Sequence, residues 1–570
     1  MNKKQGFTLI ELLAVVVIIA ILLLIAVPVT INLITKLKIS STIKSAENYL
    51  DTLEKIIVKE NMSSEFNPSS CKVLNQKQIE CDDKVLKVIV KGMGSDCGTI
   101  MLNNGQVVKV EGLQVGDYTV FTDENNKLQV SKVRSCNINT GEDESSLNEE
   151  LEDENSVITP TLVDNLIPIK YDGTNWIIAD KTKDDWYNYE KQEWANAAIL
   201  SVDKEIGNTI DITSEVKAMF VWIPRYEYKI EGQYGTHVDG TLGTQTLPGE
   251  IKINFISKKN ETPTKGYKIH PAFTFGDRNL SGIWVGKFET SHSDSYINEC
   301  NDTSCSAKYK LACTNENCKI ADGIRIVPNV GSTRANNISK FYFAARSMSR
   351  GNNAFGLNHE TTDTHLMKNS EWGAVAYLSQ SKYGKYGNSM YSGVNKEIYQ
   401  NKSTTWTTGN SNGTPSQSTR NEQCAYDDII DRGNGTGSCG GGASTTGNIT
   451  GIYDMSGGAF EMVMSNYLML VSSSGFGFDW MVDEYNDKYR DIYFSTNLEE
   501  ACDSKICYGH ALSETSGWYS DKVADYTDTK SWSIRGGGLA NPEYAGIFYY
   551  STINGAAQLY GSYRIVLIKT

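Results

Sequence analysis

The N-terminal part of the chain joins an unbroken apolar run to an amphipathic stretch. Residues 7–27 hold a single charged side chain, Glu11, and are long enough to cross a bilayer, which takes about 20 residues. After Pro28 the apolar residues return at mostly helical intervals, at Ile31, Ile34, Leu37, Ile43, Leu50, Leu53 and Ile57. The pattern predicts a long helix that ends near Glu60 and packs its outer half on a small sheet.

The residues after this helix have the pattern of β-strands. Three segments rich in Val and Ile are residues 84–92, 99–112 and 117–133. The sequences NNG at 103–105 and DENNK at 123–127 are typical of hairpin turns. We therefore expect a small β-rich head over residues 61–137. A unit of this size buries little core, so we expect disulfide staples from Cys71, Cys81, Cys97 and Cys136.

An acidic segment follows the head. Residues 139–156 read NTGEDESSLNEELEDENS and contain no basic side chain. Such a block repels itself and stays extended, so we interpret residues 138–164 as a linker. Calcium binding by this block is the alternative, but acid runs are usually just solvated.

Residues 165–570 form a second large unit in which helical periodicity is scarce. The best helix is residues 368–384, with Ser370 as its cap. Its expected core face consists of Trp372, Val375, Ala376 and Leu378. Short strands lie between Gly-, Asn-, Ser- and Thr-rich loops, at residues 219–230, 282–290 and 563–569. The pattern predicts an α+β fold with much irregular structure.

Charge and cysteine usage narrow the function class. The chain of 570 residues carries a net charge of −14, which argues against nucleic-acid binding because phosphate recognition needs basic surface. Its 12 cysteines are mostly close in sequence, for example Cys424 with Cys439 and Cys502 with Cys507. Even, loop-closing cysteines indicate disulfides and an oxidising compartment.

Four further cysteines form a cluster, namely Cys300, Cys305, Cys313 and Cys318. A four-thiolate zinc site is one interpretation of this cluster. Its intervals lack the usual two-residue knuckles, so we favour disulfides, with the pairing left open.

The apolar run begins with a specific motif. Residues 6–13 read GFTLIELL and follow a short leader that carries Lys3 and Lys4. This stretch resembles the type III signal of type IV pilins and type II secretion pseudopilins, and Pro28 sits where such pilins often carry a proline. The resemblance implies that a prepilin peptidase cuts after Gly6 and methylates Phe7, which leaves residues 1–6 as leader and 7–60 as the transmembrane and assembly helix.

The same resemblance gives Glu11 a role. Its carboxylate would pair with the Phe7 ammonium of a neighbouring subunit, because a buried charge is costly alone and tolerated when paired. The alternatives are a secretory signal peptide, a plain membrane anchor, or an acid that snorkels to the membrane surface. The signal peptide fits poorly, since no convincing small-residue cleavage site follows the run.

The large unit resembles the formylglycine-generating-enzyme (sulfatase-modifying factor) family, a branch of the C-type lectin-like fold. The resemblance rests on VGKFETS (285–291), NSEWGAVAYLSQ (369–380), GIYDMSGGAFEMVMSNY (451–467), SIRGGGL (533–539) and GSYRIVL (561–567). It implies structural roles for Trp372, Asp454, Gly457, Arg535, Gly536, Gly537 and Arg564. We expect Arg535 to satisfy backbone carbonyls or a buried acid such as Glu461.

The catalytic function of that family does not transfer to this chain. Its aerobic enzymes use a cysteine pair between the RGG and GFR elements, and the corresponding residues 536–564 contain no cysteine. The six histidines, at 237, 270, 292, 359, 365 and 510, show no ligand spacing. We therefore expect no enzyme, no catalytic residue and no cofactor. Related folds often carry structural calcium, but the acids at 478–487 do not match a known calcium loop.

Residues 536–564 have the composition of a binding surface. They are rich in Tyr, Asn, Ser, Gly and Ala, the residues that dominate antibody paratopes. The arrangement resembles the variable proteins of diversity-generating retroelements, which diversify this stretch by adenine-directed mutation. That chemistry leaves Glu543 and Gln558 fixed. The candidate ligand-binding residues are Leu539, Asn541, Tyr544, Tyr549, Tyr550, Thr552, Ile553, Asn554, Leu559, Tyr560, Ser562 and Tyr563.

Together these patterns predict a non-enzymatic adhesin or receptor-binding minor pilin. Its partners would be other pilin subunits, the prepilin peptidase, the cytoplasmic membrane before assembly, and an unidentified protein or glycan at the cell surface. A major subunit is disfavoured, because so large a head would crowd a closely packed filament. The alternatives are an envelope-tethered formylglycine-type oxidoreductase and a purely structural pseudopilin.

Overall fold

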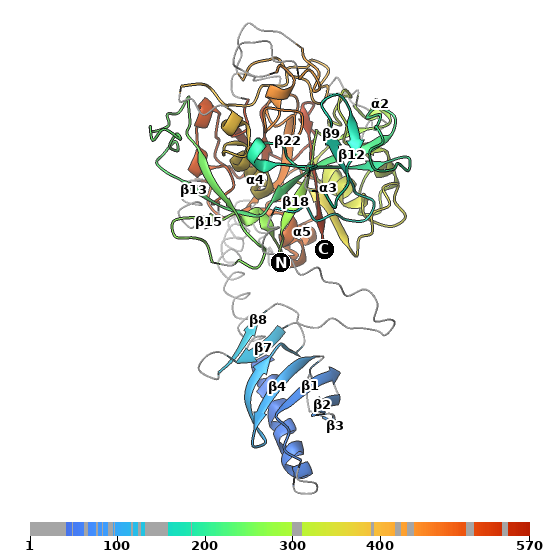
Figure 1. The fold of residues 1–570 in the computed structure, drawn as a ribbon, viewed down its shortest axis with the longest axis vertical. Helices are drawn as coiled ribbons and strands as arrows, with labels where there is room; N and C mark the ends of the chain where they lie inside the picture. The colour runs from blue at the N-terminus through green and yellow to red at the C-terminus, as the bar shows by residue number, and fades with distance from the viewer. Residues whose placement is uncertain are drawn as a thin grey trace, which may run out of the picture. The chain divides into compact units, whose positions relative to one another are not determined.

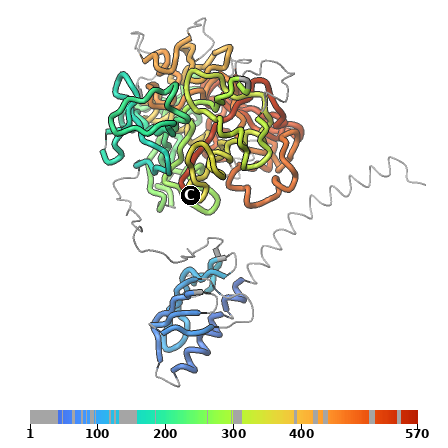
Figure 2. Tube along the Cα trace, turned by 90° about the vertical axis from the view of Figure 1, so that its right-hand side faces the viewer, coloured from blue at the N-terminus to red at the C-terminus, as the bar shows by residue number. Residues whose placement is uncertain are grey.

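An amphipathic helix and an antiparallel sheet share the core of the N-terminal unit. The computed structural model divides the chain into two units, residues 1–149 and 150–570 (Figures 1 and 2). It describes residues 42–131 and 158–570, apart from 48, 62–65, 76–77, 83, 89–94, 96, 116–117, 123–126, 184, 261, 299–310, 389–392, 416–422, 430–437, 498–506 and 539–544. The division at residue 149 falls inside the acidic segment.

The helix of the first unit covers residues 42–47 and 49–61, which confirms the predicted end near Glu60. It buries Tyr49, Leu53 and Ile57 against strand residues such as Ile79 and Ile100, and lies along one face of the sheet (Figure 1). No helix in the described part of the chain is long and apolar enough to cross a membrane. The predicted membrane segment itself lies outside the described residues, as do Gly6, Phe7 and Glu11.

The sheet of the first unit is antiparallel with strand order β3-β2-β1-β4-β5, and a second sheet has the order β6-β7-β8. The strands are β1 (Ser70–Asn75), β2 (Gln78–Cys81), β3 (Lys84–Lys87), β4 (Gly98–Asn103), β5 (Gln106–Glu111), β6 (Leu113–Val115), β7 (Tyr118–Thr122) and β8 (Leu128–Ser131). Asn104 and Gly105 turn the β4–β5 hairpin with φ of 52° and 77°, as the NNG signal predicts. A disulfide joins Cys71 and Cys81 across β1 and β2, and Cys97 is also disulfide-bonded.

A seven-stranded antiparallel sheet is the centre of the second unit, with the order β10-β9-β11-β12-β18-β27-β21. Its strands are β9 (Ile167–Tyr171), β10 (Trp176–Ile178), β11 (Asn196–Leu200), β12 (Val216–Pro224), β18 (Gly282–Gly286), β21 (Thr362–Leu366) and β27 (Ile565–Lys569). The C-terminal strand β27 therefore lies between two strands from the middle of the chain. Both faces of β12, β18 and β27 are buried, which explains their continuous apolar runs.

A second sheet carries the glycine-rich motifs. Strand β22 (Phe460–Tyr467) pairs with β24 (Trp532–Arg535), which in turn pairs with β25 (Tyr550–Ile553). Short strands β23 (Asp491–Tyr493) and β26 (Gly561–Ser562) run parallel to β22. Smaller sheets contain β13 (Tyr226–Ile230), β14 (Ile251–Phe255), β15 (Lys268–Ile269), β16 (Thr274–Phe275), β17 (Arg278–Asn279), β19 (Ser291–His292) and β20 (Ile324–Arg325).

The helices of this unit are short, namely α2 (Ser295–Asn298), α3 (Ile338–Ser347), α4 (Asn369–Ser379) and α5 (Phe478–Val482). The described residues are thus α+β, as predicted, and mostly β. Helix α4 is shorter than the predicted 368–384, because the chain turns at Gly384, packed tightly on Ser379. Lys368, not Ser370, precedes the helix, and its N–H donates to Glu371 (2.8 Å). Every residue of α4 is buried, so the predicted single core face is incomplete.

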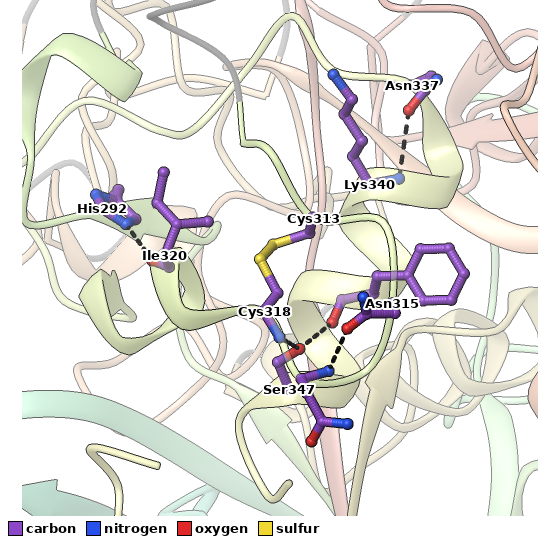
Figure 3. Close-up of a disulfide and its surroundings, with 10 residues drawn as sticks. His292, Cys313, Asn315, Cys318, Ile320, Asn337, Lys340 and Ser347 are labelled. Carbon is purple, nitrogen blue, oxygen red and sulfur yellow. Dashed lines mark hydrogen bonds between the residues drawn. A yellow bond between two sulfur atoms is a disulfide. The ribbon is translucent and has the colours of Figure 1, made fainter. Parts of the chain in front are cut away.

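Two local disulfides fasten loops of the second unit. Cys424 is bonded to Cys439, as the spacing suggested, and Cys313 is bonded to Cys318 (Figure 3). The latter excludes the four-thiolate zinc alternative, because two of the four sulfurs bond to each other. The Cys318 N–H donates to Ser347 Oγ at the end of α3 (3.0 Å). Cys507 is also disulfide-bonded, whereas Cys300 and Cys305 lie outside the described residues.

Candidate ligand-binding site

Buried arginines hold the C-terminal stretch to the core. Arg535 is fully buried and donates to the carbonyls of Ala511 (3.0 Å), Tyr549 (3.2 Å) and His510, and to Asn369 Oδ1 (2.6 Å). These carbonyl acceptors agree with the expected scaffold role. Glu461, the suggested acid, instead pairs with Arg564, which also donates to the carbonyls of Gly286 (2.7 Å) and Tyr453 (2.9 Å).

The acids near Arg564 are held in a dry environment. Asp454, at φ 64°, accepts from the Gly409 N–H (2.8 Å) and from Asn401 (2.9 Å). Burial raises the pKa of Asp454 and raises the pKa of Glu461 to about 7. At Gly457 a Cβ would lie 2.4 Å from the Asn401 carbonyl, so the glycine permits this close approach. The contacts of Asp454 and Gly457 therefore have a role in packing.

Two glycines direct the chain after β24 back onto α4. Gly536 and Gly537 have φ of 79° and 67°, and a Cβ on Gly537 would lie 2.6 Å from the Ala545 backbone. The Trp372 indole then donates to the Ile547 carbonyl (2.8 Å). Residues 545–550 are consequently fixed inside the unit, not displayed on a loop.

The structure divides the predicted ligand-binding residues into three groups. Buried, with at most 7% of the side chain exposed, are Tyr549, Tyr550, Thr552, Ser562 and Tyr563. Half-buried or exposed are Ile553, Asn554, Leu559 and Tyr560. Leu539, Asn541 and Tyr544 lie outside the described residues.

The buried group corrects the sequence-based expectation. The Tyr550 hydroxyl hydrogen-bonds to Ser533 (2.9 Å) from a strand paired in the sheet, and the Tyr563 ring stacks on Phe341 at 4.3 Å. Composition suggested surface tyrosines, but these rings are part of the core. They are not available to a ligand in this structure.

Tyr560 belongs to a stack that sequence reasoning missed. Its ring lies 5.7 Å from the Trp406 ring at an interplanar angle of 28°. The Arg334 guanidinium lies 3.8 Å from the Trp406 ring centroid and donates to the Leu559 carbonyl (3.0 Å). The one available signal was Trp406 itself, a single large aromatic residue in the polar stretch NKSTTWTTGNSNG.

A cavity of about 790 Å³ adjoins this stack. It is lined by Thr213, Ser291, His292, Ser293, Ser295, Asn298, Arg325, Val327, Pro328, Asn329, Val330, Gly331, Arg334, Thr404, Thr405, Trp406 and Thr407. Its volume falls within the range of small-molecule sites, about 300–1,000 Å³. Neither Asp nor Glu occurs among the described lining residues, so the charged side chains of the wall are arginines.

His292 is held as a structural group at the wall of this cavity. Its Nδ1 accepts from the Asp294 N–H (3.0 Å), and its Nε2 donates to the Ile320 carbonyl (2.7 Å), a contact drawn in Figure 3. With both ring nitrogens engaged, His292 has no position free for proton transfer. Among the residues that the structure describes, no group of three or more His, Cys, Asp or Glu side chains is arranged to hold a metal ion.

Comparison with known proteins assigns a class to the N-terminal end. Residues 1–27 match the family model described as the prokaryotic N-terminal methylation motif. This prepilin-type signal indicates a pilus- or pseudopilus-associated surface protein, made as a membrane-anchored precursor that a prepilin peptidase processes. A search of the curated proteins gives no match. Among solved structures, Treponema denticola variable protein 1 matches with 12% identity and a TM-score of 0.22, over 63% of this chain and 98% of that chain.

Proposed function

We propose that this chain is a minor, pilin-anchored adhesin whose second unit binds a ligand without catalysing a reaction. The observation that carries the proposal is the prepilin-type signal at residues 1–27, joined to a large unit with a cavity beside an exposed aromatic stack. The signal supplies the route to the surface, and the cavity supplies a place for a ligand.

We further propose that the second unit has the C-type lectin-like fold of the formylglycine-generating-enzyme family. The motif segments that suggested this fold are neighbours in space, which supports the proposal. Strand β18 pairs with β27, and β22 pairs with both β24 and β26. The missing cysteines of residues 536–564 are the reason to propose binding in place of oxidation.

If a retroelement diversifies the C-terminal stretch, burial limits which positions tolerate variation. Among the candidate residues, Ile553, Asn554, Leu559 and Tyr560 are the described ones at which new side chains reach solvent. Tyr550 and Tyr563 fill the core, so variants there would unfold the unit. Sequencing the gene in sister isolates, with a search for an adjacent reverse transcriptase and template repeat, tests this part of the proposal.

The adhesin proposal is tested by adhesion of cells that carry the full chain. Tyr560→Ala removes the exposed ring of the stack and should lower binding to host cells, bacterial surfaces or a glycan array by about tenfold or more. Tyr485→Ala is the matched control, because Tyr485 is also an exposed tyrosine of this unit. Equal adhesion of both variants and wild type would refute the binding role of Tyr560. Copper-dependent oxidation of thiols by the purified chain would instead favour the alternative function as an oxidoreductase.

A further inference from the structure

The cavity beside the Trp406 stack has a wall that suits an acidic ligand. The chain carries a net charge of −14, yet the charged residues among the described lining residues are Arg325 and Arg334. Asp294, the acid nearest in sequence to the lining residue His292, is not among them. A positive cavity in an acidic protein concentrates anions at its mouth.

Arg325 is held in place without a counter-ion. Its Nη2 donates to the carbonyls of Thr213 (3.2 Å) and Val216 (2.7 Å), which are neutral acceptors. Its Nε–H is buried and has no hydrogen-bond partner, and among the described residues no carboxylate pairs with it. A guanidinium whose Nη2 is fixed by carbonyls keeps its Nε–H as a donor for a carboxylate.

Trp406 supplies a second unused donor. Its indole Nε1–H is buried without a hydrogen-bond partner, and its backbone has a φ of 51°, which is strained for a bulky side chain. Strained backbone clusters at functional sites, and a buried donor without a partner requires an explanation. Both unused N–H groups are shielded from water, so a ligand would reach them only through a shift of the half-buried Arg325 and Trp406 side chains.

The side chains at the rim of the cavity indicate which class of ligand fits it. The exposed residues Ser293, Ser295, Thr404 and Thr405 line the cavity together with Trp406, whose ring stacks on that of Tyr560. Hydroxyls complement the many hydroxyls of a sugar, and aromatic edges pack against its C–H surface. An extended peptide would instead require a row of backbone hydrogen-bond partners.

We propose that this cavity binds a sugar that carries a carboxylate, with the carboxylate at Arg325 and the Trp406 indole and the ring at the hydroxyl rim. The inference rests on the proposed binding function and names the ligand class of that site. In this proposal the N–H groups of the Arg325 guanidinium and the Trp406 indole recognise the carboxylate of the sugar.

The test measures binding of free sugars to the detergent-solubilised full chain by calorimetry. Glucuronic acid and N-acetylneuraminic acid should bind with a Kd of about 1 mM or tighter, at least about tenfold more tightly than glucose or N-acetylglucosamine. Higher salt should weaken this preference, because the charges are partly exposed. Acidic sugar should also raise the Tm of the second unit by mass action.

Three variants make the assignment specific. Arg325→Gln should lose about tenfold or more of the affinity for the acidic sugars, and Arg325→Lys should regain part of it by restoring charge. Trp406→Phe keeps an aromatic ring and removes the indole N–H, so it should weaken acidic sugars several-fold. Arg278→Gln, at an exposed arginine of β17 outside the cavity lining, is the control and should bind as wild type. Circular dichroism verifies that each variant is folded.

Several results would overturn the proposal. Neutral and acidic sugars binding equally, or folded Arg325→Gln and Trp406→Phe variants binding as wild type, would remove the carboxylate site. Acetate, inorganic phosphate or a peptide binding as tightly as glucuronic acid would remove the sugar assignment. A third result would separate the two proposals. If Tyr560→Ala lowers adhesion but acidic sugars do not bind, the adhesin function is supported and this ligand class is refuted.

Discussion

Buried cationic side chains replace sheet hydrogen bonds in the loop-rich second unit. Lys287 is fully buried and donates to Asn196 Oδ1 (2.9 Å) and to the carbonyls of Ile449 and Gly451 (both 2.7 Å). Burial lowers the pKa of Lys287 well below its usual range and lowers the pKa of Arg535 to about 10. Irregular backbone leaves carbonyls without ladder partners, and these side chains satisfy them.

Asp521 provides a test of this dry interior by pH. Its carboxylate accepts from the Phe548 N–H (2.9 Å), and burial raises its pKa from 3.8 to about 8. Between these values the folded chain holds a proton that the unfolded chain releases, so the free energy of unfolding falls as pH rises. Asp521→Asn removes this component, so its stability relative to wild type should increase steadily from pH 5 to pH 8.

Denaturant unfolding of the full chain, followed by tryptophan fluorescence at several pH values, measures this effect. Asp528→Asn, at an exposed aspartate nearby, should follow the wild-type curve and serves as the control. A difference between Asp521→Asn and wild type that stays constant across the range would contradict an elevated pKa at Asp521.

Residue patterns predicted the scaffold arginines better than their partners. The resemblance to the RGG and GFR elements implies structural roles for Arg535 and Arg564, and both are buried. The sequence could not tell which of them meets Glu461, because Arg535 and Glu461 are opposite each other across β24 and β22 while the ion pair forms with Arg564. Directly opposite residues share a face of the sheet, so the choice of partner depends on tertiary neighbours outside the strand pair, and one sequence does not reveal those.

At the scale of elements, regular segments were predictable and central short strands were not. The helix that ends at residue 61, the turn at Asn104 and Gly105, and the apolar strand β12 followed from periodicity and turn chemistry. The residues of strand β25 belong to the stretch whose composition predicts a binding surface. The strand pairs with β24 inside the sheet, so tertiary packing decided the exposure of Tyr550.

Disulfides of different loop length give a prediction at this scale. Cys424 and Cys439 are 15 residues apart, so Cys424→Ser with Cys439→Ser should lower the free energy of unfolding by about 3 kcal/mol. Cys313 and Cys318 are 5 residues apart, and their double serine variant should lose about 2 kcal/mol, because a shorter loop constrains the unfolded chain less. Chemical unfolding of the two variants compares them directly, and a larger loss from the shorter loop would contradict this entropic account.

At the scale of the whole molecule, the proposed function depends on features from the two ends of the chain. The assembly signal occupies residues 1–27, and the candidate ligand site includes Tyr560. The sequence predicted the N-terminal signal from a specific motif and the C-terminal candidate site from its composition. It missed Trp406 and Arg334. Both residues lie more than 150 positions before Tyr560 in the sequence, and contacts over such a separation leave no local sequence pattern.

The display role predicts a defect in assembly when the acid of the apolar run is neutralised. In the proposed subunit Glu11 pairs with the Phe7 ammonium of a neighbour, and a charge left without a partner in the membrane costs about 2.5–3.5 kcal/mol. Glu11→Gln should still be cut after Gly6, but at least about tenfold less of it should appear in sheared surface filaments. Glu47→Gln, at an exposed position of the described helix, should assemble normally. Mass spectrometry of membrane and filament fractions measures both steps, and a surface protein that retains Met1, or Glu11→Gln filaments at wild-type abundance, would refute the pilin mechanism.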